Sequence, residues 1–160
     1  MEIFKVAFFG HREIENIRDV EKRLYKVISD LILEKEYVEF LVGRNGEFDT
    51  LVSSQIKFAK KNIRCDNNSL CLVLPYLYAE YKNNKQYFEK YYDEIIVSES
   101  ASKAYYKNAI TIRNREMVDK ADMIICCVYK NFGGAFNVMK YAQKKNKLII
   151  NLGIFEDITS

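Results

Sequence analysis

The sequence predicts an α/β protein with a doubly wound, mostly parallel sheet of about six strands and helices on both faces. Two observations lead to this prediction. Short, continuously apolar runs of the kind found in central parallel strands alternate with segments whose apolar residues recur at helical spacing. Strands that alternate with helices form βαβ units, whose connections place helices on both sides of a parallel sheet.

The predicted strands are six apolar runs, at residues 3–9, 37–42, 70–74, 94–97, 123–129 and 148–152. A helix between the first two strands is indicated by apolar residues at helical spacing, namely Ile17, Val20, Leu24, Val27 and Leu31. A second helix, after the second strand, has the stripe Phe48, Leu51, Val52, Gln55, Ile56 and Ala59. No repeat or Pro/Ser-rich linker interrupts the pattern, so residues 1–160 are predicted to form a single domain.

Composition narrows the function classes. The chain has 160 residues, 49% hydrophobic and 29% charged, which is ordinary globular material with enough length for a core. No run approaches the roughly 20 apolar residues of a membrane span, and no signal peptide is recognisable, so we expect a cytoplasmic protein without a membrane partner. A net charge of +3 permits an anionic ligand, but it gives no reason to expect nucleic acid as a partner.

The four cysteines form neither a CxxC pair nor a cluster with the single histidine. Cys126 and Cys127 lie inside an apolar run, which favours reduced thiols buried in a strand. A redox role or a role at a ligand site is the alternative for Cys127, which lies nearer the end of that strand. We expect neither a metal site nor a cofactor.

Residues 75–111 are dense in aromatic side chains. One interpretation is that these rings pack a helix onto the sheet and cover its edge. The alternative is that one of them stacks on a base, and Tyr76, which follows Pro75 at a strand end, is the candidate.

Ligands of open α/β sheets bind beyond the carboxyl ends of the strands, so the loops after the strands are the candidate site. Gly10, His11 and Arg12 directly follow the first strand. The glycine allows a tight turn, and the next two side chains are potential cations. His11 could orient a ligand or the neighbouring loop rather than transfer a proton.

The loop of residues 43–49 leads from the second strand into a helix, a context in which backbone N–H groups and the helix dipole bind anions. It matches neither the dinucleotide fingerprint nor the Walker pattern. Asp49 could accept a hydrogen bond from a ribose hydroxyl or cap the helix. The candidate ligand-binding residues of this loop are Gly43, Arg44, Asn45, Gly46 and Asp49.

Two further candidates lie later in the chain. Arg113 and Asn114 are placed at the start of the helix before the fifth strand, where the arginine could grip a phosphate in bidentate fashion. A solvated charged helix face would look similar in sequence. Gly133 and Gly134 occupy the junction between that strand and the next helix, which is a turn by its simplest interpretation. Together, the four loops predict an anion-binding rim on one edge of the sheet.

These segments, in order and spacing, resemble the YpsA-like branch of the SLOG superfamily, which is named for the Smf/DprA and LOG proteins. The resemblance covers roughly residues 3–150, and its most specific part is the RNxxMVD pattern of residues 113–119 followed by an apolar strand and a glycine pair. It implies a Rossmann-like fold and a nucleotide or nucleotide-derived ligand. It also implies a possible homodimer, because SLOG relatives commonly dimerise.

The LOG hydrolases resemble this chain but carry a PGGxGTxxE loop, whose glutamate helps to cleave an N-glycosidic bond. Lys140 stands at the corresponding position here. A lysine would repel the positive charge that develops in such a reaction, so it cannot replace the carboxylate. If the chain were a hydrolase, the catalytic candidates would be Glu47, Asp49 and Glu116.

The leading hypothesis from the sequence is therefore a cytoplasmic SLOG-type domain, residues 1–160, that senses or sequesters a nucleotide or a nucleotide-derived small molecule. The alternative is a nucleotide N-glycosidase or phosphoribohydrolase-like enzyme. Single-stranded DNA binding ranks last, because the net charge is modest and the sequence shows no dense basic stripe.

Overall fold

The computed structural model describes residues 1–153, so the last seven residues of the predicted domain lie outside it. Within that range the chain forms a six-stranded sheet in which every pairing is parallel. The strands are β1 (Ile3–Gly10), β2 (Tyr37–Val42), β3 (Asn68–Leu74), β4 (Glu94–Val97), β5 (Met123–Cys127) and β6 (Leu148–Asn151). The predicted α/β class and the number of strands are confirmed, and the sheet is wholly rather than mostly parallel.

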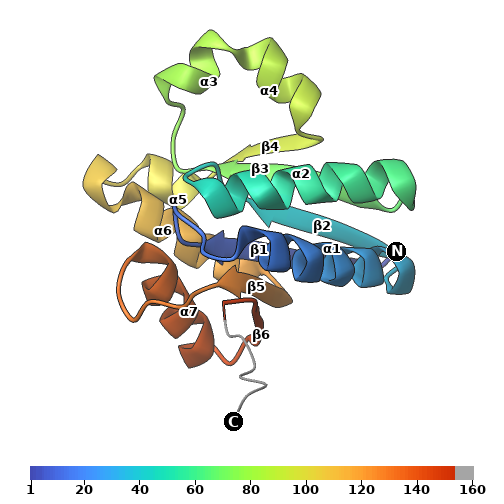
Figure 1. The fold of residues 1–160 in the computed structure, drawn as a ribbon. Helices are drawn as coiled ribbons and strands as arrows, with labels where there is room; N and C mark the ends of the chain where they lie inside the picture. Colours follow the sequence, from blue (N-terminus) through green and yellow to red (C-terminus); the bar gives the residue numbers. More distant parts are fainter. Residues whose placement is uncertain (154–160) are drawn as a thin grey trace.

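Helices cover both faces of this sheet (Figure 1). The described helices are α1 (Ile17–Glu34), α2 (Glu47–Asn62), α3 (Ala79–Asn83), α4 (Lys85–Tyr91), α5 (Glu99–Ser102), α6 (Tyr106–Lys120) and α7 (Gly134–Lys144). Side chains of α1 and α2 pack with one face of the strands, and those of α6 and α7 pack with the other. Phe8 of β1 belongs to the first core and its neighbour Phe9 to the second, as the alternation of a strand requires.

The strand order is β4-β3-β2-β1-β5-β6. The chain builds outward from β1 to β4 and then crosses to the other side of β1 to add β5 and β6. The order therefore reverses beside β1, and a reversal of this kind opens a crevice at the carboxyl ends of the flanking strands. This topology gives the loops after β1 and β5 a shared space.

Two helices differ in detail from the sequence prediction. In α1 the buried residue of the third turn is Ile28 rather than Val27, and Ile17 is 37% exposed. In α6 the helix begins at Tyr106, so Arg113 lies in its middle rather than at its start. The earlier start follows from Ala109, which is buried and continues the helical face that carries Arg113 and Met117.

The aromatic-rich segment forms an excursion beyond β4, made of α3 and α4 (Figure 1). Tyr81, Phe88 and Tyr92 are buried and join the core on the α1–α2 face. Tyr76 is 37% exposed and meets the ring of Tyr78 edge-on, with 6.1 Å between the ring centroids. Part of the segment therefore packs against the sheet, as one interpretation of the sequence expected.

None of the helices within residues 1–153 combines the length and the apolar character needed to cross a bilayer. The cytoplasmic location expected from the sequence stays a prediction.

Candidate functional site

A cavity of about 450 Å³ lies at the carboxyl ends of β1, β2 and β5, where the strand order reverses. Ten of the thirteen ligand-binding residues proposed from the sequence line it: Gly10, His11, Arg12, Gly43, Asn45, Asp49, Arg113, Asn114, Gly133 and Gly134. The topology thus brings together loops that are more than a hundred residues apart in the sequence.

Arg113 is the most deeply buried of the charged groups in the cavity, with 4% of its surface exposed. Its Nη1 donates to the carbonyl of Val73 at 3.1 Å, while Nε and Nη2 donate to Oδ1 of Asn114 at 3.1 and 2.8 Å. These bonds use three of the five N–H groups of a guanidinium, and the other two have no acceptor within residues 1–153. Arg113 therefore gives the cavity wall a positive charge and two N–H groups without an acceptor among residues 1–153.

The charge of Arg113 has no contact ion pair, since no carboxylate within residues 1–153 lies within 4.0 Å of its nitrogens. Asp49 is near, and the two side chains meet at Gly43. A Cβ on Gly43 would lie 3.1 Å from both Arg113 Nη1 and Asp49 Oδ2. The absence of a side chain at Gly43 lets both groups approach the backbone there.

Asp49 is half-buried, and its Oδ2 accepts a hydrogen bond from the backbone N–H of Asn45 at 2.8 Å. Burial raises the pKa of this carboxyl above its usual value, and the bond from Asn45 and the charge of Arg113 oppose that rise. Burial lowers the pKa of Arg113, which Asp49 opposes in turn. An arginine nevertheless stays protonated at neutral pH, so the cavity keeps its cation.

The amino end of α7 supplies a second group of donors. Gly133 is the N-cap, with φ of 97°, a left-handed conformation that favours glycine. The first N–H groups of a helix have no partner inside the helix, and Gly134 and Ala135, which carry two of them, line the cavity. Helix N-termini of this kind bind anions.

His11 holds the loop that leads from β5 to α7. Its Nε2 accepts hydrogen bonds from the backbone N–H groups of Tyr129 at 3.2 Å and Lys130 at 3.3 Å. The imidazole also meets the Tyr129 ring edge-on, with 4.7 Å between the centroids. Of the two roles that the sequence left open, the geometry supports orientation of the neighbouring loop.

We expect the protein to be less stable in mild acid than at neutral pH, because the hydrogen bonds that His11 accepts are then lost. Burial, and then the charge of Lys130, lower the pKa of His11, so between the folded and unfolded pKa values the unfolded chain binds more protons. The stabilisation is present above about pH 6.5, the unfolded value, and is lost as the pH falls below it. Urea unfolding between about pH 7 and about pH 5.5 measures how steeply the free energy of unfolding changes with pH.

His11→Gln is the control for that experiment, because its amide oxygen can accept a hydrogen bond and does not titrate. The variant should show a shallower dependence of the free energy of unfolding on pH. If the free energy of unfolding depends on pH equally steeply in the wild type and in His11→Gln, His11 is not the source of the pH dependence.

Three residues proposed from the sequence do not line the cavity: Arg44, Gly46 and Tyr76. Arg44 turns toward the α3–α4 excursion, where it binds Glu80 at 3.1 Å and the hydroxyl of Tyr92 at 3.1 Å. Its guanidinium also lies 4.7 Å from the centroid of the Phe88 ring. Arg44 therefore joins the excursion to the loop after β2.

Of the catalytic candidates, Asp49 alone lines the cavity. Glu47 accepts a hydrogen bond from the backbone N–H of Ile14 at 3.3 Å. Glu116 accepts from the hydroxyl of Ser98 and from Lys120. The structure therefore does not bring the three carboxylates together.

The sequence did not single out several residues that line the cavity, chiefly Ile110, Met117, Lys130 and Phe132. Phe132 and Ile110 are 65% and 40% exposed, so the mouth of the cavity is partly apolar. Lys130 and Phe132 lie in the loop between β5 and Gly133. Their position just after a strand was the available signal, since ligands bind beyond strand ends.

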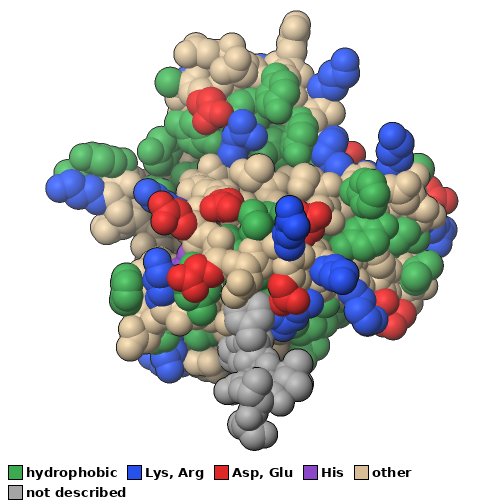
Figure 2. Space-filling model, viewed as in Figure 1, with side chains coloured by type: hydrophobic (Ala, Val, Ile, Leu, Met, Phe, Trp, Pro, Cys, Tyr) green, Lys and Arg blue, Asp and Glu red, His purple; other side chains and the backbone are tan. Residues whose placement is uncertain are grey.

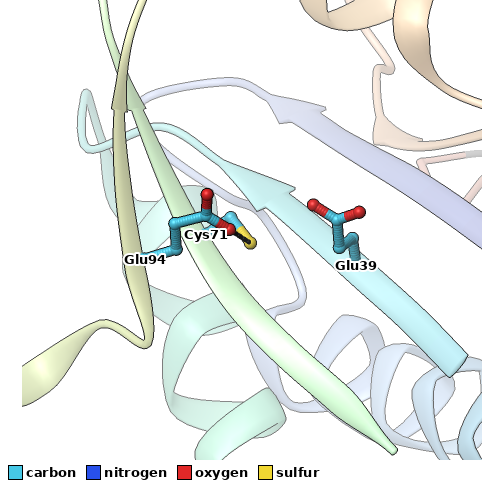
Figure 3. Close-up of side chains that lie close together, drawn as sticks. All are labelled: Glu39, Cys71 and Glu94. Carbon is cyan, nitrogen blue, oxygen red and sulfur yellow. Dashed lines mark hydrogen bonds between the residues drawn. The ribbon is translucent and has the colours of Figure 1, made fainter. Parts of the chain in front are cut away.

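One group of possible metal ligands occurs within residues 1–153, and it lies outside the cavity. Glu39, Cys71 and Glu94 come from β2, β3 and β4, with one ligand atom of each within 4.8 Å of the others (Figure 3). The thiol of Cys71 donates to Glu94 at 3.6 Å, and burial, with a smaller effect of both glutamates, raises its pKa to about 12. The thiol thus keeps its proton and has a partner, and we assign no metal here.

Cys126 and Cys127 are buried, and burial raises their pKa values to about 12 and about 11. Neither lines the cavity. The interpretation of these residues as protonated thiols within a strand fits this environment.

The strand order and the position of the cavity define a Rossmann-like α/β domain with a crevice at the switch point. Two solved structures are similar to it. DNA processing protein A (DprA) from Streptococcus pneumoniae has a TM-score of 0.66 and 15% identity, over 99% of this chain and 52% of that protein. The second is DNA processing protein A from Helicobacter pylori, in a structure that describes its unique single-stranded DNA binding mode. It has a TM-score of 0.64 and 16% identity, over 92% of this chain and 64% of that protein.

These neighbours belong to the Smf/DprA family of the SLOG superfamily. Their TM-scores show that this chain shares their fold, and at 15–16% identity they show the fold alone. This chain spans about half to two thirds of their length. No protein-family model and no curated protein matches the sequence.

The ranking of functions made from the sequence was wrong. It placed a small nucleotide-derived ligand first and single-stranded DNA last, with nucleic acid considered an unlikely partner, whereas one of the similar structures describes the single-stranded DNA binding mode of its protein. The ranking relied on the net charge of +3, which hides an uneven distribution. Residues 106–153 hold nine Lys and Arg against three Asp and Glu, a net of +6, and residues 1–98 hold fifteen against sixteen.

Proposed function

We propose that this chain binds single-stranded DNA and that the cavity beside β1 holds one of its phosphates. The observation that carries the proposal is Arg113, a buried cation with two N–H groups left to donate and no contact ion pair. An arginine of this kind suits the bidentate recognition of a phosphate. The N–H groups at the start of α7 line the same cavity and add donors to it.

The rim of the cavity supports a strand rather than an isolated phosphate. Phe132 and Ile110 line the mouth, and Tyr106 lies one helical turn before Ile110 with 63% of its surface exposed. Exposed rings beside a positively charged groove are the usual platform for unpaired bases, and each stacked base is worth about 1–3 kcal/mol. Arg12 and Lys130 add positive charge at the same mouth.

Fluorescence anisotropy with a labelled oligo(dT) of about ten nucleotides tests the proposal, with a duplex of equal length as the comparison. We expect the single strand to bind more tightly than the duplex. If Arg113, Arg12 and Lys130 each neutralise a phosphate, affinity should fall at least about 20-fold between about 50 mM and about 200 mM salt. No binding at the lower salt, or equal affinity for the duplex, would overturn the proposal.

Two finer assignments remain part of this proposal. We place the chain in the YpsA-like branch and in the cytoplasm, both on the strength of the sequence. The RNxxMVD pattern and the glycine pair support the first assignment, because both contribute residues to the cavity wall.

A further inference from the structure

The positive charge of this chain is concentrated around α6, which precedes β5, and α7, which follows it. Residues 106–153 carry the net of +6, and they include α6 and α7. On the α1–α2 face, by contrast, acidic and basic side chains are interspersed (Figure 2). The α6–α7 surface is therefore the side of the molecule best suited to a polyanion.

Aromatic rings are interleaved with the cations on this surface. The Tyr141 ring lies between α6 and α7, where its hydroxyl donates to Asp119 at 2.8 Å. The Arg115 guanidinium lies 5.1 Å from the centroid of this ring, and the Lys145 ammonium lies 5.5 Å from it. Such a combination of cations and rings is typical of surfaces that bind single-stranded nucleic acid.

Four cations of this surface are free to bind a ligand. Arg115, Lys140, Lys144 and Lys145 are exposed, and none has a carboxylate within 4.0 Å among residues 1–153. Lys120, in contrast, is paired with Glu116 at 3.0 Å. We call these four residues the α6–α7 cations.

Along the chain, the α6–α7 cations follow residues of the cavity wall. Asn114 lines the cavity and directly precedes Arg115, while Gly134 lines it and opens α7. Lys145 follows the last residue of α7, about 16 Å along the helix axis from Gly134. That length corresponds to about five nucleotides of a stacked strand.

We propose that a single strand whose phosphate is held in the cavity continues along α6 and α7, where the α6–α7 cations neutralise its next phosphates. This path rests on the function proposed above and extends it from one phosphate to a segment of about five nucleotides. Tyr141 would face the strand as a ring between two of the cations.

The test compares two labelled oligo(dT) probes, of about three and about ten nucleotides, because only the longer one can cover both the cavity and the path. Replacing all four α6–α7 cations with glutamine should weaken binding of the longer probe and leave the shorter one unchanged. With about 0.7 counterions released per phosphate, the longer probe's slope of log affinity against log salt should become shallower by up to about 2.8.

The matched control removes four exposed cations from α1, α2 and α4: Arg18, Lys22, Lys61 and Lys90, each replaced with glutamine. It makes the same change of net charge and should leave the salt slope of the longer probe unchanged. Thermal melting verifies that both variants are folded.

Three outcomes would count against the path, and they are distinguishable. An unchanged slope in the α6–α7 variant, or an equal loss in the control, would overturn the path while leaving the cavity as the binding site. Failure of the wild type to bind either probe would overturn the proposed function and the path together.

Discussion

Replacing Arg113 with glutamine should weaken binding of single-stranded DNA by roughly 30- to 150-fold. Removing one partner of a buried, charge-assisted contact costs about 2–3 kcal/mol or more, and each 1.4 kcal/mol is about a tenfold change in affinity. The loss should be large because Arg113 is the buried cation of the cavity and has two N–H donors available. Anisotropy titrations at one fixed salt concentration measure it.

Arg44→Gln is the matched control, since it removes the same charge from a neighbouring loop. Arg44 faces Glu80 and Tyr92 rather than the cavity, so this variant should bind DNA nearly as the wild type does. Arg113→Lys keeps the charge but loses the planar fork, and it should fall between the two. The phosphate assignment would fail if Arg113→Gln and Arg44→Gln bound DNA with similar affinity.

Replacing Gly10 with alanine should destabilise the fold by about 3 kcal/mol. A Cβ on Gly10 would lie 2.3 Å from Cγ of Phe48, a residue of α2 that is fully buried in the core on the α1–α2 face of the sheet. Because the ring has no free space to enter, the new methyl group must displace β1 or α2. For a domain of this size the melting temperature should fall by roughly 6–12 °C.

Gly134→Ala gives the comparison for that experiment. A Cβ on Gly134 would meet no atom within 4 Å, so the melting temperature should stay the same or rise slightly. Equal melting temperatures for Gly10→Ala and Gly134→Ala would show that the contact with Phe48 does not constrain the fold.

Much of the fold could be read from local patterns. The six strands lie within a few residues of their predicted positions, because a buried parallel strand is a continuous apolar run that needs no distant partner to be recognised. The start of α6 was missed by seven residues. Its first turns carry exposed residues such as Tyr106 and Ile110, so the apolar periodicity is weak where the helix begins.

The candidate site could be predicted to the level of loops. Glycines after strands, at Gly10, Gly43 and Gly133, marked three of the loops that form the cavity. Lys130 and Phe132 were missed because their residue types form no distinctive pattern, and their position after a strand was the available signal. The uneven distribution of charge along the chain can be read from the sequence, but the net charge of +3 does not show it.

The sequence by itself determined the α/β class, the succession of strands and helices, and the set of loops at the carboxyl ends of the strands. These follow from hydrophobic periodicity and turn residues, which act over short stretches of chain. Only the tertiary structure decided which arginine enters the cavity. Arg44 and Arg113 look alike in sequence, but Tyr92 and Glu80 draw Arg44 toward the α3–α4 excursion, while Val73 and Asn114 hold Arg113 at the cavity. The direction of a long side chain depends on partners that the fold brings from distant positions, and no local pattern contains them.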